Sequence, residues 1–239
     1  ADPRFADIAP DWVFAWHNLP GLPLGFAALR EGPVNCASRG LRIALAGRTS
    51  HASTPERALS PMRALAALMP ALADLSRGDV ADPDFALVTV THATLGERAF
   101  GVAPGAAELW ATLRALTDAG MSALVARAEA LARGAATADG LGVSIEHSDV
   151  FDHCHNDPEA VAILARALDA QGVPRGEAGL PMRASEDFGR FGARAKTAMF
   201  FLGAGERHPG LHEPDYDFPD ALAPIAAGAM ERVARDLLG

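Results

Sequence analysis

The segment from residue 38 to residue 150 alternates strand and helix patterns in an order that few folds can accommodate. Leu41, Ile43 and Leu45 alternate with Arg42 and Ala44, which is the period of a half-buried strand. The patterns that follow are a helix opening at Ser60-Pro61, strands at 85–94 and 108–116, a helix beginning at Asp118, and a strand at 142–150. This order is that of a ferredoxin-like split βαβ unit, in which both helices lie on one face of one sheet.

Apolar residues recur along both predicted helices at the helical spacing. They are Met62, Leu65, Met69 and Leu72 in the first helix, and Met121, Leu124, Val125, Ala128 and Leu131 in the second. Ser60 and Asp118 are suitable N-caps, because their side-chain oxygens can accept hydrogen bonds from the first-turn N–H groups. We therefore expect both helices to bury these apolar faces.

The flanking segments, 1–37 and 151–239, contain the pieces of a parallel α/β sheet. Trp12–Trp16 is a short apolar run typical of a buried strand, and Ala198–Leu202 is typical of a strand covered on both faces. Residues 1–37 are too few to fold alone, so we expect them to pack with 151–239 as one α/β domain. Residues 38–150 are then an insertion, and the few strands of the α/β domain predict an incomplete sheet.

Charge and cysteine content narrow the class of protein. Asp and Glu number 30 against 21 Lys and Arg, and the net charge of −9 disfavours nucleic acid or an anionic membrane as a partner. No stretch approaches the roughly 18–20 apolar residues of a membrane span. The two cysteines, Cys36 and Cys154, cannot form a disulfide framework and suit the reducing cytoplasm.

Two histidines lie where α/β proteins place ligands. His17 ends the first buried strand, and His212 lies in the loop that follows the apolar strand at 198–202. The neutral imidazole is a common metal ligand. On spacing alone, metal binding and ordinary loop histidines that bond to water both remain open.

Three further groups of residues are candidates for catalysis or metal binding. His51 lies among small residues after the first strand of the insertion, either as a hydrogen-bond donor to a developing oxyanion or as a turn residue. Glu186 and Asp187 are at a predicted helix start, where negative charge suits the helix dipole. The sequence His153-Cys154-His155 is interpreted as a hinge and not as a metal site, because adjacent side chains of an extended chain point apart.

Several motifs occur in an order that resembles a known family. They are His17-Asn18-Leu19-Pro20-Gly21, Ser50-His51-Ala52-Ser53 after Gly47, Ser185-Glu186-Asp187-Phe188, Gly203-Ala204-Gly205-Glu206, and Leu211-His212 with Tyr216-Asp217-Phe218 after it. This order is similar to that of the metal-dependent amidohydrolases among the aminoacylase-like metallopeptidases, such as hippurate hydrolase and the hydrolases of auxin–amino acid conjugates. The resemblance covers essentially the whole chain.

The resemblance implies an α/β catalytic domain with an inserted ferredoxin-like lid that mediates dimerisation. His17 and His212 would be ligands of a two-metal site, and His51 would polarise the carbonyl of the scissile bond. Asn18, Gly101 and Glu186 would contact the substrate, an N-acyl or N-aroyl amino acid. Imidazole and carboxylate donors suit Zn²⁺, Mn²⁺ or Co²⁺, and the bound ions would activate a water molecule.

The chain also departs from the family pattern. It has neither the Cys-Gly-His metal motif nor the paired-Glu motif of the family's N-terminal segment, and Gly101-Val102-Ala103-Pro104 replaces the usual Asn-x-Ile-Pro. We therefore expect the chain to be the C-terminal part of a longer enzyme and inactive alone. Two alternatives remain: a non-catalytic protein that keeps the lid and its dimer interface, and a ligand-binding module built on the ferredoxin-like sheet.

Overall fold

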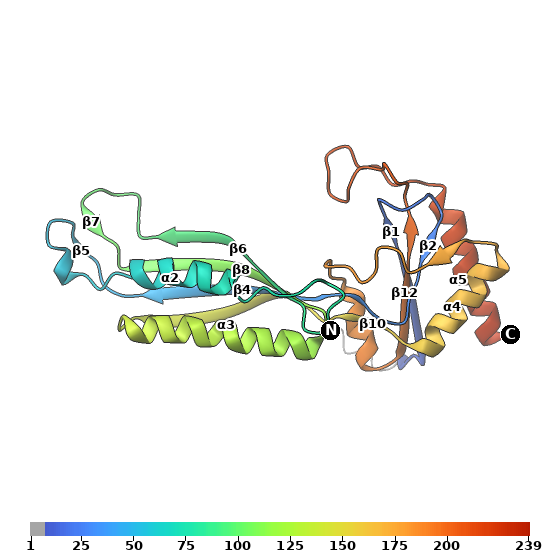
Figure 1. Cartoon of the computed structure of the whole chain (residues 1–239), viewed down its shortest axis with the longest axis horizontal. Helices are drawn as coiled ribbons and strands as arrows, with labels where there is room; N and C mark the ends of the chain where they lie inside the picture. Colours follow the sequence, from blue (N-terminus) through green and yellow to red (C-terminus); the bar gives the residue numbers. More distant parts are fainter. Residues whose placement is uncertain (1–7) are drawn as a thin grey trace. The chain divides into compact units, whose positions relative to one another are not determined.

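The computed structural model describes residues 8–239, which form two compact units (Figure 1). The terminal unit runs to Asn35 and continues from Cys154 to Gly239, and the inserted unit is Cys36–His153. The sequence placed these two boundaries at 37/38 and 150/151. Each unit is described separately below.

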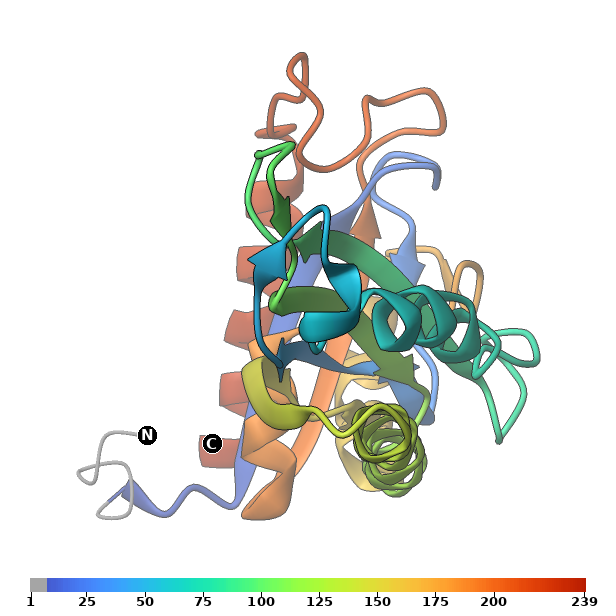
Figure 2. The same ribbon diagram turned by 90° about the vertical axis from the view of Figure 1, so that its left-hand side faces the viewer.

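The inserted unit has one four-stranded antiparallel sheet in the order β6-β8-β4-β9. Its main elements are β4 (Ala37–Ala46), α2 (Met62–Ala73), β6 (Ala86–Leu95), β8 (Ala106–Ala115), α3 (Asp118–Ala138) and β9 (Gly142–Phe151). Figure 2 shows α2 and α3 end-on, side by side on one face of the strands. This strand order with both helices on one face is the split βαβ arrangement.

The core of the inserted unit lies between the sheet and the two helices. Leu41, Ile43 and Leu45 of β4 are almost fully buried there, as their alternation predicts. The face predicted for α2 was wrong in part: Leu68 is buried, whereas Met62 is 52% exposed. Apolar side chains occur on several sides of α2, so the helical spacing fits more than one face.

The helix starts also differ from the expectation. Thr117, and not Asp118, is the N-cap of α3, and its side chain accepts a hydrogen bond from the Gly120 N–H at 3.1 Å. Pro61 takes the N-cap position of α2, and the Ser60 hydroxyl accepts only a long bond of 3.4 Å from the Met62 N–H. Thr117 has the extended backbone of an N-cap, with φ of −133° and ψ of 160°, whereas Pro61, with φ of −77° and ψ of 4°, makes no side-chain capping bond.

The terminal unit is built on a second four-stranded sheet in the order β1-β12-β2-β11. Its strands are β1 (Trp12–Leu19), β2 (Ala27–Ala28), β11 (Arg175–Gly176) and β12 (Lys196–Gly203). β1 and β12 are parallel over eight residues, but β2 is antiparallel to β12. The expectation of a parallel sheet was therefore wrong in part, because the short connection after β1 only reverses the chain, whereas a parallel return needs a longer crossover.

A small two-stranded sheet joins β3 (Gly32–Asn35) to β10 (Cys154–Asn156). The segment 153–155 was expected to be a hinge; the boundary between the two units falls within it, between His153 and Cys154, and Cys154 and His155 belong to the strand β10. The side chains of Cys154 and Asn156 are buried and that of His155 is exposed. Adjacent side chains of this short strand therefore point to opposite faces, which is the reason given above against a metal site at His153-Cys154-His155.

Two helices cover one side of the larger sheet of the terminal unit (Figure 1). They are α4 (Pro158–Ala170) and α5 (Leu222–Leu238), and η2 (Asp187–Ala193) is a 3-10 helix that packs beside β12 and β10. Asp157 caps α4 by accepting bonds from two first-turn N–H groups. In β12 every residue after Lys196 is buried, as its continuous apolar run predicts.

No helix within residues 8–239 combines the length and the apolar character that crossing a membrane requires.

Candidate functional site

His17 lies two residues before the end of β1 and packs beside β12. Its ring centroid is 6.4 Å from that of Phe201, its partner in the parallel pairing. Its Nδ1 donates a hydrogen bond of 2.6 Å to the Asn18 carbonyl oxygen. This bond leaves the lone pair of the neutral ring on Nε2, and metal-binding histidines commonly hold their second nitrogen in this way.

The carboxylate of Glu186 faces the same ring nitrogen. Glu186 Oε1 is 4.0 Å from His17 Nε2, and both side chains are about one-third exposed (27% and 36%). Although Glu186 occupies the N-cap position of η2, its side chain makes no capping hydrogen bond. The pKa of Glu186 is raised above its usual value, chiefly by burial and also by the nearby Asp187, while the proximity of His17 lowers it in part. Glu186 therefore contributes to the His17 site, and not to the helix start by capping.

The loop after β12 covers the end of β1. Leu211, Tyr216 and Phe218 of this loop line a cavity of about 420 Å³ together with three residues of β1, Trp16, His17 and Asn18. His212 follows Leu211 in an exposed, left-handed backbone conformation with φ of 68°. The structure thus brings the loop of His212 to His17, and the contact made by the His212 ring itself stays a prediction.

Asn18 has an unsatisfied acceptor in this cavity. Its side chain is buried, and Nδ2 donates to the Tyr216 hydroxyl. Its Oδ1 has no hydrogen-bond partner among the described residues. A buried acceptor without a partner costs about 1–3 kcal/mol, so a donor from a bound molecule would stabilise the site. The sequence analysis assigned no role to Tyr216. Because Tyr216 is the only tyrosine of the chain and lies in a polar loop, it could have been singled out as a candidate site residue.

His51 and Gly101 lie together in the inserted unit. β5 (Ser50–His51) pairs with β7 (Val102–Ala103), and the Ala52 N–H donates to the Gly101 carbonyl at 3.0 Å. The Ser53 N–H donates to His51 Nδ1 at 3.1 Å, so the proton of the neutral ring is on Nε2. The exposed His51 ring is thereby a hydrogen-bond donor at Nε2, as oxyanion stabilisation would require.

Cys154, which lies beside Glu186, supplies no thiolate to the His17 site. Cys36 and Cys154 are both buried, and the Cys154 thiol donates a weak bond of 3.9 Å to the Glu186 carbonyl. Burial, and then the negative charge of Glu186, raise the pKa of Cys154 to about 12. A metal-binding cysteine must be a thiolate, so Cys154 is excluded as a ligand at neutral pH.

The donors around His17 fit one part of a metal centre and not a whole one. Imidazole and carboxylate are suitable ligands for divalent cations. However, no three His, Cys, Asp or Glu side chains converge on a common point anywhere in the described range 8–239. A two-metal centre therefore needs donors beyond those that these residues bring together.

Comparison with known proteins identifies the family. The sequence profile of peptidase family M20/M25/M40 matches residues 3–236, and the chain belongs to this family. This confirms the family resemblance found from the motifs.

Two curated relatives define the likeness further. The chain is 30% identical over 236 residues to hippurate hydrolase of Campylobacter jejuni, covering 98% of this chain and 61% of the relative. It is 30% identical over 205 residues to N-acetyldiaminopimelate deacetylase of Shouchella clausii, covering 85% of this chain and 54% of the relative. The chain thus spans little more than half the length of these relatives.

Solved structures share the fold. A putative aminohydrolase of methicillin-resistant Staphylococcus aureus matches with a TM-score of 0.82 at 23% identity, covering 96% of this chain and 60% of that one. A Bacillus subtilis protein described as a dinuclear metal-binding peptidase from the M20 family matches with a TM-score of 0.77 at 19% identity, covering 95% and 57%. Both likenesses establish a mixed α/β fold of this family.

Proposed function

We propose that this chain is part of a metal-dependent amidohydrolase that cleaves the amide bond of N-acyl or N-aroyl amino acids. The observation that carries the proposal is the state of His17 at the end of β1. Its Nδ1 is engaged by a backbone carbonyl, and its Nε2 faces the carboxylate of Glu186 at 4.0 Å. Membership of family M20/M25/M40 and the names of the two curated relatives support the same reaction class.

In this proposal His17 and His212 are ligands of a two-metal centre that is complete only in the longer protein. Two bound cations, Zn²⁺, Mn²⁺ or Co²⁺, would polarise the amide and supply hydroxide from water near neutral pH. The Bacillus subtilis neighbour, described as dinuclear, supports two ions. The 239-residue chain alone is then inactive, because its own donors are too few.

The remaining site residues would bind the substrate and the developing charge. His51 Nε2–H would donate to the oxyanion that forms at the cleaved carbonyl. The unpaired Asn18 Oδ1 is placed to accept a bond from an N–H of the substrate. Glu186, and the backbone at Gly101, would contact the substrate, with Gly101 next to His51 in the small hairpin.

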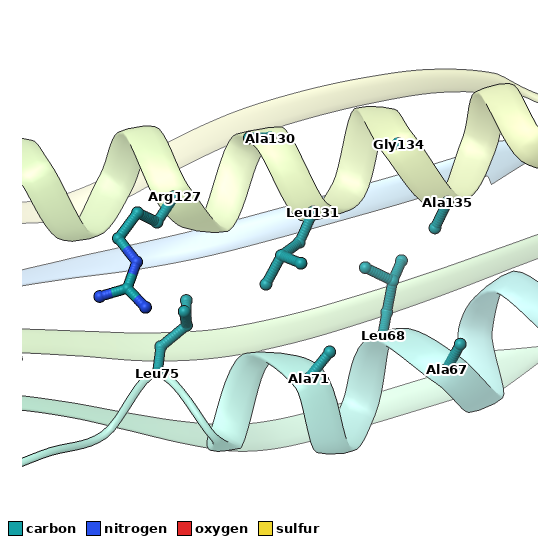
Figure 3. A pocket seen from close by; sticks show the side chains of 9 residues that line it. All are labelled: Ala67, Leu68, Ala71, Leu75, Arg127, Ala130, Leu131, Gly134 and Ala135. Carbon is teal, nitrogen blue, oxygen red and sulfur yellow. The ribbon is translucent and has the colours of Figure 1, made fainter.

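We further propose that the inserted unit acts as a lid and joins two copies into a homodimer in the cytoplasm. It has an apolar groove of about 540 Å³ between α2 and α3. Figure 3 shows Leu68 and Leu131 pointing toward each other across this groove, with small residues on both helices. Small side chains allow a second copy to approach closely. Sedimentation of the Ala71→Glu variant should then give a monomer, and an unchanged dimer would exclude the groove.

The reaction is tested with the complete protein and with the chain alone. We expect hydrolysis of hippurate by the complete protein with Mn²⁺ or Zn²⁺, and none by the chain. Turnover by the chain would contradict the argument from missing donors. If the complete protein binds no metal and hydrolyses no N-acyl amino acid, the non-catalytic alternatives gain.

Single variants of the complete protein separate the roles of the histidines. His212→Ala should lower the bound metal, measured by elemental analysis, by one ion per chain. His51→Ala should lower turnover and leave the metal content unchanged. His208→Ala is the matched control, because His208 lies in the same loop as His212 with its ring against Tyr216. Equal metal loss in the His208 and His212 variants would mean that the loop, and not the His212 ring, is required.

A further inference from the structure

The cavity at the end of β1 combines an apolar wall with three polar side chains. Its volume of about 420 Å³ is within the range of small-molecule sites. The rings of Trp16 and Phe218 form part of the apolar wall, with their centroids 6.1 Å apart. The polar side chains belong to His17, Asn18 and Tyr216. The apolar wall suits an acyl or aryl group, and the polar side chains decide which hydrogen-bonding group can accompany it.

The Asn18 side chain presents a hydrogen-bond acceptor, and not a donor, to a bound molecule. A primary amide donates at one end and accepts at the other, so its orientation decides what it can bind. Nδ2 donates to the Tyr216 hydroxyl, and Oδ1 has no partner among the described residues. Asn18 is only 7% exposed, so bulk water does not satisfy this oxygen. A bound molecule must therefore supply a donor here or leave a buried acceptor unpaired.

Tyr216, which fixes the Asn18 amide, is itself held by its own loop. Its N–H donates to the Glu213 carbonyl at 3.0 Å, and its ring meets that of His208 edge-on, with centroids 5.3 Å apart. Glu213 is tied in turn to Gly210, whose N–H donates to its carboxylate at 2.8 Å and whose carbonyl accepts its N–H at 3.1 Å. The hydroxyl of Tyr216 thus has a set position from which it orients Asn18.

We propose that Asn18 Oδ1 accepts the N–H of the amide bond that is cleaved, and that Tyr216 is the positioning residue that keeps this oxygen available. The inference rests on the proposed function for the class of substrate. An N-acyl amino acid such as hippurate has one N–H group, that of the amide itself. His17, the proposed metal ligand, precedes Asn18 and lines the same cavity, so the acceptor and the ligand belong to one site.

The consequence is a specificity for secondary amides. An ester, or an amide whose nitrogen carries an alkyl group, has no N–H and leaves the buried oxygen of Asn18 unpaired. A site built to bind an N–H group rejects the analogue without it for this reason. We expect the loss of the Asn18 acceptor to remove at least about tenfold of the preference for an amide over an ester of the same shape.

The binding test follows the amide proton of ¹⁵N-labelled hippurate by nuclear magnetic resonance, with the complete protein free of metal. Binding to the parent should shift this proton downfield, because it becomes hydrogen-bonded. The shift should be absent with Asn18→Leu and smaller with Tyr216→Phe. All three proteins keep the same aromatic wall, so ring-current effects are common to them. No shift with the parent, or the same shift with Asn18→Leu, would overturn the inference.

The specificity test compares hippurate with benzoylglycolate, in which an ester oxygen replaces the N–H, using the complete protein with Zn²⁺. The ratio of the two kcat/KM values should fall at least about tenfold in Asn18→Leu, chiefly through a higher KM for hippurate. Tyr216→Phe, which keeps the ring and removes only the hydroxyl, should lower the ratio by a smaller factor. Phe218→Leu is the matched control: it alters the apolar wall for both substrates and should leave the ratio unchanged.

The outcomes separate this inference from the proposed function. A parent-like ratio in Asn18→Leu, or an equal change in the Phe218 control, would overturn the role of Asn18. A parent-like ratio and shift in Tyr216→Phe would overturn the positioning role of Tyr216. A shifted amide proton with no hydrolysis of either substrate would support the inference and contradict the proposed function, whereas hippurate hydrolysis with an unchanged ratio would do the reverse.

Discussion

Asn156 links three segments of the terminal unit through one buried amide, and its replacement should be strongly destabilising. Its Nδ2 donates to the carbonyl oxygens of Arg30 at 3.0 Å and Met199 at 2.8 Å. Its Oδ1 accepts from the Met199 N–H at 2.8 Å. Because β2 pairs only with Phe201 and Leu202 of β12, the Asn156 side chain takes over the role of a strand at Met199.

The magnitude follows from the groups that the Asn156→Ala variant would leave unpaired. The buried N–H and C=O of Met199 and the part-buried Arg30 carbonyl lose their partners, and a buried group costs about 1–3 kcal/mol when unsatisfied. We expect the free energy of unfolding to fall by about 4 kcal/mol, since water in the vacated space restores part of the loss. Thr197→Val is the matched control: its buried hydroxyl donates a single bond of 3.0 Å to the His155 carbonyl, worth about 1 kcal/mol.

The assay is urea unfolding followed by tryptophan fluorescence. Trp12 and Trp16 lie in the terminal unit and Trp110 in the inserted unit, so a Trp110→Phe background makes the signal specific to the terminal unit. The expected order of stability is parent, Thr197→Val, then Asn156→Ala. An Asn156→Ala loss no larger than that of Thr197→Val would refute the reasoning that this amide completes the β12 ladder.

Three further predictions concern packing, reactivity and pH. Gly203→Ala should lower the free energy of unfolding by about 2–3 kcal/mol in the same assay, because the added Cβ would lie 2.0 Å from the Pro23 carbonyl oxygen; unchanged stability would mean that the loop moves freely. Cys154, with its pKa raised to about 12 chiefly by burial, should resist iodoacetamide at pH 8 until urea is added, and rapid labelling of the folded chain would contradict its assigned burial. The hydrogen bonds from Arg175 lower the pKa of Asp169 below its usual value of 3.8. The pair therefore stabilises the fold above that pH, and this stabilisation is lost as the pH falls through the pKa of the folded state. The free energy of unfolding of Asp169→Asn should differ from that of the parent at pH 7 and become equal to it in acid.

The elements with strong periodicity could be predicted from the sequence. The alternation in β4 and the continuous apolar run in β12 each correspond to one burial pattern, and the structure has both. Predictions from weaker patterns were wrong where the pattern fitted two different arrangements equally well. The apolar face of α2 is one such case, because Leu68 and Met62 both continue a helical spacing, and only packing selects Leu68. The two-residue strands β2 and β11 have no pattern from which their direction could be predicted.

The sequence indicated His17, Asn18 and Glu186 as candidate site residues, but it gave neither their contacts nor the part taken by Tyr216. His17 could be placed at a strand end because that end is set by the apolar run before it. The approach of Glu186 to His17 and the bond between Asn18 and Tyr216 depend on how distant loops fold back, which no local pattern records. The tautomers assigned to His17 and His51 likewise depend on backbone partners that only the structure shows.

The proposal depends most on one geometric claim, that His17 and His212 bind the same pair of cations. Anomalous diffraction from crystals of the complete protein grown with Mn²⁺ tests it directly. The account predicts two adjacent metal peaks, with nitrogen atoms of both imidazoles at coordination distance, about 2.0–2.2 Å. Metal peaks that neither ring reaches, or a fully loaded centre with the two histidines in separate cavities, would contradict it.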